Sequence, residues 1–382
     1  MKCQKNKFLL TRKEAYLNCA YMSPQLKKVE NVGRKGLAMK RKPHKIAPED
    51  FFKDGEEVRK QFSKLINSSE PLRSVLIPSV SYGMGTVTKN VSIKKGENII
   101  VLGDQFPSNV YPWMRVCKEN DAILKTVKAP DTLENRGKKW NAEIISAIDE
   151  KTKVVAISHV HWADGTLFDL EAIRVATSQV GALLVIDGTQ SIGALPFDVE
   201  KIKPDALVCA SYKWLLGPYG IGMAYFGSAF DNGIPLEENW INRKNSEDFA
   251  NLVNYQKEYR EGALRYEVGE HSNPILTPML LQALKQLNHW QPDFIQEYCK
   301  KLVSESLAEI QELGLFVEKE SYRSHHLFGI KYPADKLDAL QKSFKQNKVK
   351  ISIRGEFIRV SPNVYNDELD MKKLVRSIKQ VF

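Results

Sequence analysis

Short apolar runs alternate with amphipathic stretches between residues 75 and 227, and no other feature of the chain constrains the fold as strongly. The runs occupy residues 75–78, 98–102, 153–158, 182–186, 206–209 and 222–226. Continuous Val, Ile and Leu runs of this length are typical of strands that are buried on both faces. Between them, residues 141–148 and 170–179 place apolar side chains at helical spacing. Strands that alternate with helices predict an α/β domain with a mostly parallel sheet.

The chain changes character after this region. Residues 228–262 are polar and show no sustained periodicity, which indicates a loop. Helical patterns at 276–287 and 294–313 and strand patterns at 328–332 and 349–360 then precede a C-terminal helix. With 382 residues, the chain is long enough for two domains. We expect a large α/β domain over residues 20–262 and a small α+β domain built from residues 1–19 and 263–382.

The cysteines and the hydropathy pattern indicate a reducing, aqueous compartment. The five cysteines are scattered and form no C-x-x-C pair, so neither a disulfide framework nor a metal site is expected. No apolar stretch is long enough to cross a bilayer, and the apolar patch at residues 8–10 is too short for a signal-peptide core. We therefore expect a cytoplasmic protein with no membrane partner.

The formal net charge of +10 raises the question of an anionic partner. Because the Lys and Arg residues are spread along the chain and accompany no nucleic-acid-binding motif, we expect no nucleic-acid partner. The dense basic segment at residues 35–45 could be a solvated surface loop or an entrance that attracts anionic substrates. We favour the surface loop.

Two chemically distinctive residues follow neighbouring apolar runs of the predicted sheet. Asp187 ends one run and Lys213 follows the next, and ligands gather where parallel strands end. Tyr212 and Trp214 flank the lysine, so its amine can be partly desolvated and its pKa lowered, as imine formation requires. Taken singly, Asp187 could cap a helix and Lys213 could be an ordinary surface lysine. Together with Gln190 they favour a catalytic site.

The surrounding segment resembles the cofactor-binding core of class V aminotransferases. The matching residues are Asp187-Gly-Thr-Gln190-Ser-Ile-Gly193, then Asp198, Lys213 and Gly217-Pro-Tyr-Gly-Ile-Gly222. This family includes cysteine desulfurases, kynureninases and isopenicillin N epimerase-like proteins. The resemblance implies an enzyme that depends on pyridoxal 5'-phosphate (PLP) and has fold type I, with a large domain and a smaller α+β domain.

The resemblance also implies roles for the residues of this core. Lys213 would hold the cofactor as a Schiff base and then act as general acid and base at the substrate α-carbon. Asp187 would pair with the pyridine nitrogen, and Gln190 would contact the ring hydroxyl oxygen. Tyr212, beside the lysine, is expected among the cofactor-binding residues.

Two further segments are expected to hold the cofactor. Ser79, Val80 and Ser81 follow the first predicted strand and suit a phosphate site of backbone amides, with Ser81 where the family has Thr. Phe106 lies where kynureninase-like members carry the residue that stacks on the pyridine ring. The alternative for Phe106 is a core phenylalanine before a turn.

Other parts of the chain resemble the family's substrate and subunit contacts. His161 and Trp162 lie in a stretch similar to a family signature, His161 being expected to face the substrate and Trp162 the cofactor. Arg359 is expected to bind the substrate carboxylate through its bidentate fork, with Arg354 as second choice. The stretch with Ser272 and Asn273 resembles one that reaches the partner subunit's phosphate, which implies a homodimer. The residues expected to make these contacts are therefore Ser272, Asn273, Arg359, His161 and Trp162.

The reaction is less constrained than the cofactor. Residues 348–359 contain no cysteine, which argues against a dedicated cysteine desulfurase. We expect an aminotransferase acting on an amino-acid substrate, because transamination needs no catalytic group beyond Lys213. The alternatives are a lyase or epimerase that is kynureninase-like, cysteine/selenocysteine lyase-like or isopenicillin N epimerase-like. A non-catalytic binding protein of the same fold is a further alternative, but the intact Asp187, Gln190 and Lys213 argue against it.

Overall fold

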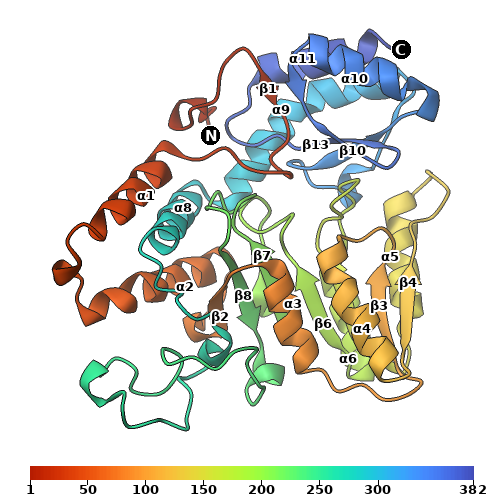
Figure 1. Ribbon diagram of the computed structural model, residues 1–382. Helices are drawn as coiled ribbons and strands as arrows, with labels where there is room; N and C mark the ends of the chain where they lie inside the picture. The colour runs from red at the N-terminus through yellow and green to blue at the C-terminus, as the bar shows by residue number, and fades with distance from the viewer.

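A computed structural model describes all residues, 1–382, and its largest element is a seven-stranded sheet (Figure 1). The strand order is β2-β8-β7-β6-β5-β3-β4. The strands are β2 (Ser74–Ile77), β3 (Asn98–Leu102), β4 (Ile123–Val127), β5 (Thr152–Ser158), β6 (Leu183–Asp187), β7 (Ala206–Ala210) and β8 (Gly222–Phe226). Only β8 runs antiparallel to its neighbours. The six predicted strands and the mostly parallel sheet are confirmed.

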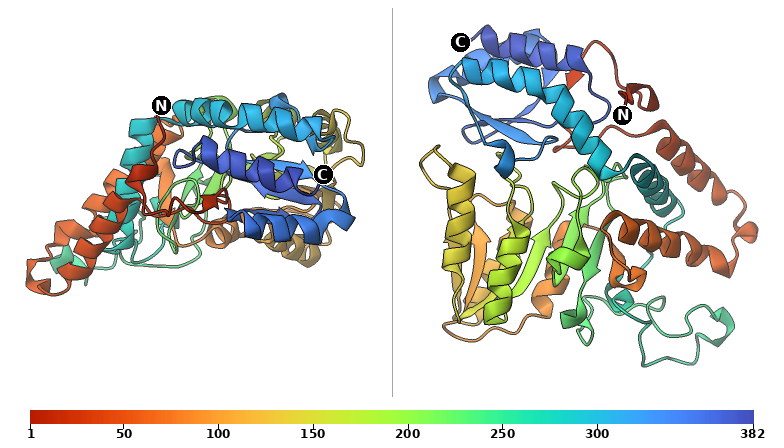
Figure 2. Two further views of the ribbon diagram at one scale, coloured as in Figure 1. Left: turned by 90° about the horizontal axis from the view of Figure 1, so that it is seen from above. Right: turned by 180° about the vertical axis from the view of Figure 1, so that it is seen from behind.

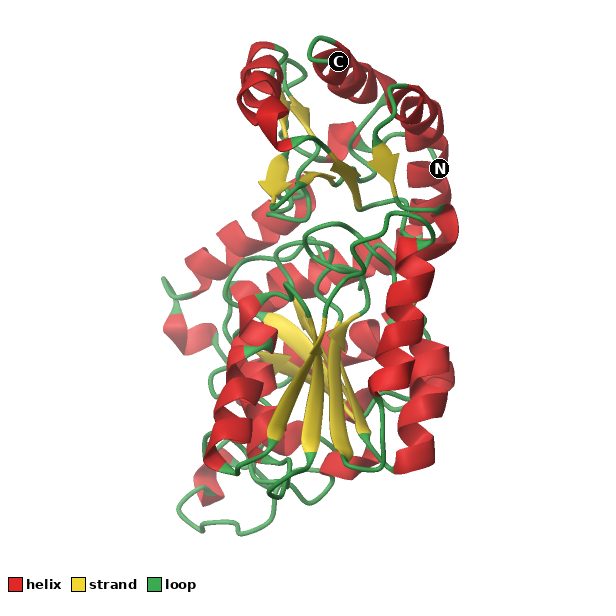
Figure 3. Ribbon diagram, turned by 90° about the vertical axis from the view of Figure 1, so that its right-hand side faces the viewer, coloured by secondary structure: helices red, strands yellow, loops and turns green.

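Helices cover both faces of this sheet (Figure 3). They include α3 (Val80–Lys89), α4 (Tyr111–Glu119), α5 (Arg136–Ala147), α6 (Leu170–Val180) and the short α7 (Val199–Ile202). Strand β3 shows why its apolar run is continuous: Ile99 and Val101 belong to one hydrophobic core, and Ile100 and Leu102 belong to the core on the other face. Because both faces are buried, apolar residues occupy four consecutive positions after Asn98 instead of alternating with polar ones.

A second, smaller sheet lies beyond one end of the large sheet (Figure 1). It is antiparallel, with strand order β12-β13-β10-β9. Its strands are β9 (Phe316–Val317), β10 (Phe328–Lys331), β12 (Ser352–Arg354) and β13 (Phe357–Val360), and its helices are α9 (Pro292–Glu312), α10 (Leu337–Gln346) and α11 (Glu368–Lys379). A separate hydrophobic core holds these elements together. Figure 2 shows the helices of this part lying together on the outer side of its strands.

The two ends of the chain meet in this smaller part. Strand β1 (Ala15–Tyr16) pairs in parallel with β11 (Val349–Lys350). Helix α8 (Leu276–Trp290), by contrast, packs against α1 (Lys27–Met39) and α2 (Lys53–Leu65), which flank the large sheet (Figure 1). The domain boundary expected at residue 262 stays a prediction. None of the helices combines the length and the apolar character that a membrane crossing would require.

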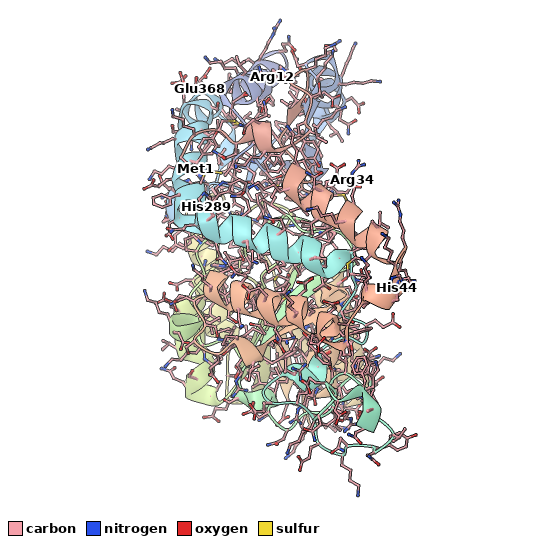
Figure 4. All side chains as sticks on the ribbon, turned by 90° about the vertical axis from the view of Figure 1, so that its left-hand side faces the viewer. Met1, Arg12, Arg34, His44, His289 and Glu368 are labelled. Atoms are coloured by element: carbon pink, nitrogen blue, oxygen red, sulfur yellow. The ribbon has the colours of Figure 1, made fainter.

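The polar segments lie at the surface. Residues 228–262 contain only short 3₁₀ turns, Ser228–Phe230 and Phe249–Asn251. Every Lys, Arg and His of the basic segment 35–45 is exposed. In Figure 4, Arg34 and His44 mark the outer edge of the molecule near the end of α1. This position is consistent with a solvated surface loop.

A buried ion pair connects the large sheet to the helices beside it. Arg59 of α2 donates from Nη1 to both carboxylate oxygens of Glu267 at 2.9 Å, and Glu267 also accepts the backbone N–H of Leu76 in β2 at 3.0 Å. Replacing Glu267 by Ala leaves a buried guanidinium without its partner. We expect the free energy of unfolding to fall by about 3–5 kcal/mol, measured by denaturant titration.

The exposed pair Glu30–Arg34 provides the matched control. Glu30→Ala should change the free energy of unfolding by less than about 1 kcal/mol. Equal losses in the two variants would contradict a stabilising role for the buried pair.

Candidate active site

A cavity opens at the carboxyl ends of the parallel strands of the large sheet. Its wall contains residues that follow or end five strands: Ser79 after β2, Phe106 after β3, Ser158 at the end of β5, Asp187 at the end of β6 and Lys213 after β7. Because these strands run in one direction, their carboxyl ends meet at the same edge of the sheet. The fold therefore brings residues from distant parts of the sequence to one site.

Lys213 and Asp187 face this one cavity and influence each other's charge. Burial lowers the pKa of Lys213 to about 8, although the carboxylate of Asp187 opposes that shift. Burial raises the pKa of Asp187, while hydrogen bonds from Thr189, including its backbone N–H at 2.9 Å, and the charge of Lys213 act in the opposite direction. The amine is therefore easily made neutral, and the acid lies in a setting that favours pairing with a cation.

Gln190 is fixed one turn after Asp187. Its Nε2 donates to the carbonyl oxygen of Ala20 at 3.2 Å, and its Oε1 accepts the indole N–H of Trp214 at 2.9 Å. Its second amide hydrogen remains available to a ligand in the cavity, which Gln190 helps to line. Gly193 makes this packing possible, because it has φ +102° and a Cβ there would lie 2.4 Å from the carbonyl oxygen of Trp214.

Aromatic rings surround the amine of Lys213. Its Nζ lies 5.4 Å from the ring centroid of Phe106 and 5.5 Å from that of Tyr212. The ring of Trp162 meets Phe106 edge to face at 5.5 Å. Phe106 is 36% exposed and lines the cavity, so it is not a core phenylalanine.

The N-terminus of α3 forms the far end of the cavity. Ser79 caps this helix by accepting the backbone N–H of Tyr82 at 3.2 Å, and its hydroxyl lies 2.9 Å from that of Ser81. Ser79, Val80 and Ser81 all line the cavity. Free backbone N–H groups at a helix start attract phosphate.

Two buried polar atoms in the cavity wall were not identified from the sequence. Ser158 Oγ and Gln105 Oε1 have no hydrogen-bond partner. Ser158 lies directly opposite Asp187 in the β5–β6 ladder. The one signal in the sequence was that each residue lies at or just after the end of an apolar run. Buried polar atoms without hydrogen-bond partners are rare, so these two indicate a ligand.

Not every predicted residue reaches the cavity. His161 does not line it, because its side chain is buried and both ring nitrogens have partners, Asp164 Oδ1 at 3.1 Å and the carbonyl oxygen of Gly103 at 3.3 Å. The substrate contact expected for His161 is therefore not supported by this geometry. Its neighbour Trp162 does line the cavity, and Arg359 is held beside it by a hydrogen bond to the Trp162 carbonyl oxygen at 2.8 Å.

Ser272 and Asn273 also lie outside the cavity wall. Asn273 Oδ1 accepts the backbone N–H groups of Ile275 and Leu276, both at 2.9 Å, at the start of α8. The local sequence thus gives Asn273 a capping role within its own chain. A contact with a partner subunit's phosphate stays a prediction for both residues.

The chemistry of this cavity fits PLP. It offers a buried amine of lowered pKa, a buried acid, an exposed aromatic ring and a helix N-terminus that suits a phosphate. The unpartnered Ser158 and Gln105 oxygens are further groups that a polar ligand can satisfy. This fold and this site define a PLP-dependent enzyme of fold type I. Residues 34–376 match the family Aminotransferase class-V, and the chain belongs to that family.

Curated relatives include an aminotransferase and cysteine desulfurases. The chain is 24% identical to an uncharacterized aminotransferase, YcbU, from Bacillus subtilis (strain 168), over 85% of this chain and 82% of the relative. It is 31% identical to a cysteine desulfurase from Shigella sonnei (strain Ss046) over 183 residues. That second match covers 47% of this chain and 44% of the desulfurase.

Solved structures show the same fold across nearly the whole chain. A variant of C-DES with glycine covalently linked to PLP has a TM-score of 0.88 at 16% identity and covers 99% of this chain and 100% of its own. C-DES is described as a cystine C-S lyase, and its complex with cysteine persulfide has a TM-score of 0.86 at 17% identity, covering 97% and 98%. The predicted fold type and family are confirmed.

The lowered pKa of Lys213 leads to a pH-dependent result. Only the neutral amine attacks an aldehyde, so the rate at which PLP attaches should rise with pH and level off above about pH 8. Stopped-flow absorbance after mixing cofactor-free protein with PLP measures this rate. Arg359→Gln should move the midpoint upward, because the charge of Arg359 lowers the pKa of Lys213. A midpoint near that of an ordinary lysine would show that the amine is not desolvated.

Proposed function

We propose that the chain is an aminotransferase that acts on an amino-acid substrate. The observation that carries this proposal is Lys213, a buried amine of lowered pKa that faces the cavity. When bound, PLP withdraws electrons from the substrate α-carbon. Lys213 would hold the cofactor through its amine and would accept and return the proton at that carbon. Asp187 would stabilise the protonated pyridine nitrogen of the cofactor, and Phe106 would stack on its ring.

The phosphate end and the substrate end of the proposed site have separate residues. Ser79, Val80 and Ser81 bind the phosphate through backbone and hydroxyl groups, because they surround the N-terminus of α3. Arg359 binds the substrate carboxylate. Its hydrogen bond to the Trp162 carbonyl oxygen holds the guanidinium group beside the cavity.

The second candidate is a PLP-dependent lyase, favoured by the 31% identity to a cysteine desulfurase. A desulfurase that passes sulfur to its own thiol needs an accessible cysteine. Four of the five cysteines are buried: Cys19, Cys117, Cys209 and Cys299. Burial also raises the pKa of Cys19 to about 11, which keeps it a thiol. Cys3 is partly exposed but does not line the cavity. A lyase that needs no thiol, of the cysteine or kynureninase type, therefore ranks second.

Epimerisation ranks below both reactions. It needs a second acid or base on the ring face opposite the lysine. The residue proposed for that face is Phe106, which has no titratable group.

We also propose a cytoplasmic homodimer in which Ser272 and Asn273 approach the partner subunit's phosphate site. The resemblance of their segment to that of related dimers supports this. Light scattering coupled to gel filtration gives the oligomeric state. Ser272→Ala should weaken PLP affinity only if the dimer forms.

One experiment separates these reactions. The purified protein is reconstituted with PLP and incubated with an amino-acid panel in the presence and absence of a 2-oxo acid. An aminotransferase yields a new amino acid and a new 2-oxo acid in equal amounts. Sulfide or alanine formed without a 2-oxo acid acceptor would indicate a lyase instead. A protein that stays colourless with PLP would overturn both.

A further inference from the structure

Two arginines of the small sheet lie together beside the cavity. In the β12–β13 ladder, Ser352 lies opposite Arg359 and Arg354 opposite Phe357. Opposite residues share a face of the sheet, as do residues two apart, so Arg354 and Arg359 are diagonal neighbours on one face. Their guanidinium carbons lie 5.6 and 5.9 Å from the ring centroid of Trp162.

Trp162 links this arginine pair to the cavity. Its ring lines the cavity together with Lys213 and Asp187, whereas neither arginine is itself part of the lining. Both arginines nevertheless lie close enough to lower the pKa of Lys213 through their charges. Anything bound against Trp162 and Lys213 therefore lies within the field of two guanidinium groups.

No acidic side chain neutralises the pair. Three arginines of the chain are buried, and two of them bind carboxylates: Arg59 binds Glu267 and Arg136 binds Asp164. Arg359, which is 1% exposed, forms no ion pair, and neither does Arg354. Two like charges in a partly buried setting are unfavourable unless an anion joins them.

Both guanidinium groups also have unused donors. The Nε atoms of Arg354 and Arg359 are buried without a hydrogen-bond partner. The hydrogen bonds that the two residues do form go to neutral carbonyl oxygens, Arg354 to Ile353 at 2.8 Å and Arg359 to Trp162 at 2.8 Å. Each fork can still take a carboxylate in a bidentate arrangement, so the pair has room for two anionic groups.

The phosphate of the cofactor is not the missing anion. Its proposed site follows β2, whereas Trp162 follows β5, and these strands are four positions apart in the sheet. That separation is about 19 Å along the sheet edge. The anions that reach the arginine pair must therefore belong to the substrate.

We propose that the site selects an amino acid that carries two acidic groups, with its α-carboxylate on Arg359 and the acidic group of its side chain on Arg354. This rests on the proposed function only in taking an amino acid as the substrate. Arg354 is the residue that distinguishes a substrate with two acidic groups from one with the α-carboxylate alone, and its planar fork matches a second carboxylate.

Binding of simple acids to the PLP-loaded enzyme tests this inference without turnover. Isothermal titration compares three pairs of equal length: succinate with butyrate, glutarate with pentanoate, and adipate with hexanoate. At least one dicarboxylate should bind about 10- to 100-fold more tightly than its monocarboxylate. Arg354→Gln should remove that difference while monocarboxylate affinity stays within about twofold, and Arg354→Lys should keep part of it. Arg359→Gln should weaken both acids of each pair.

Two results would overturn the inference. One is equal binding of the dicarboxylate and the monocarboxylate in all three pairs. The other is an Arg354→Gln variant, folded as judged by its melting curve, that weakens both acids equally, since Arg354 would then share the α-carboxylate. Failure of the aminotransferase proposal is seen separately, because selectivity for dicarboxylates would persist without any amino-group transfer.

Discussion

Lys213→Ala should lower turnover about 10³-fold or more and should abolish the visible absorption band that borohydride reduces. Under the proposed function this amine both attaches the cofactor and moves the proton at the substrate α-carbon, and proton transfer alone contributes about 10²–10⁴-fold. Absorbance before and after borohydride, followed by peptide mapping of the reduced protein, measures attachment. Amino-acid turnover in the presence of excess PLP measures the catalytic part.

The matched control for this substitution is Lys118→Ala. Lys118 is exposed on α4 and contacts no acidic group, so this variant should keep the band and the activity of the parent. A Lys213→Ala protein that still forms a borohydride-sensitive bond would place the attachment at another lysine.

Asp187→Asn should lower turnover by about 10²–10³-fold while PLP remains bound. The substitution keeps the acceptor for the Thr189 backbone N–H but removes the negative charge that we propose pairs with the pyridine nitrogen of the cofactor. Spectroscopic titration with PLP separates binding from chemistry. The exposed Asp131→Asn provides the control, and an equal loss in both variants would argue against a specific role for the buried charge.

The same substitution should stabilise the cofactor-free protein at neutral pH. Burial raises the pKa of Asp187 above that of an unfolded chain, so the folded state holds the proton more tightly. Stability from this group is therefore greatest at acid pH and falls as the pH rises through the raised pKa. Asparagine avoids that loss, so the melting temperature of Asp187→Asn should exceed the parent's at pH 7 and approach it near pH 3. A lower melting temperature at pH 7 would contradict this assignment.

The sequence predicted the buried strands well and missed one strand that is largely exposed. Strands such as β3 and β7 are buried at every residue, so their apolar runs are continuous and easily recognised. Strand β4 lies at the edge of the sheet and includes Lys125 and Thr126, and it was not predicted. The other edge strand, β2, is buried at every residue and was predicted, whereas every residue of β4 is at least partly exposed, so no apolar run marks it.

The placement of three residues in the cavity wall was predictable for a related reason. Asp187 ends β6, and Gln190 and Lys213 come three residues after β6 and β7, so their chain positions fix where they lie. The substrate contact expected for His161 stays a prediction that this geometry does not support, because Asp164 and the distant Gly103 occupy its ring nitrogens. The pairing of Arg354 and Arg359 across a hairpin beside Trp162 likewise required the register of β12 and β13.

The parallel pairing of β1 with β11 has a consequence for how the protein is made. Residue 16 leaves the ribosome roughly 20–70 s before residue 350, at about 5–20 residues per second. During that interval β1 has no partner strand. The hydrogen bond from Gln190 to the Ala20 carbonyl oxygen then forms on an N-terminal segment that β11 does not yet hold in place. The segment that supports Gln190 is thus anchored at both ends only at the close of synthesis, whereas the cavity wall itself comes from residues 78–221. Nascent chains stalled before residue 349 should therefore bind the coenzyme more weakly than the complete chain.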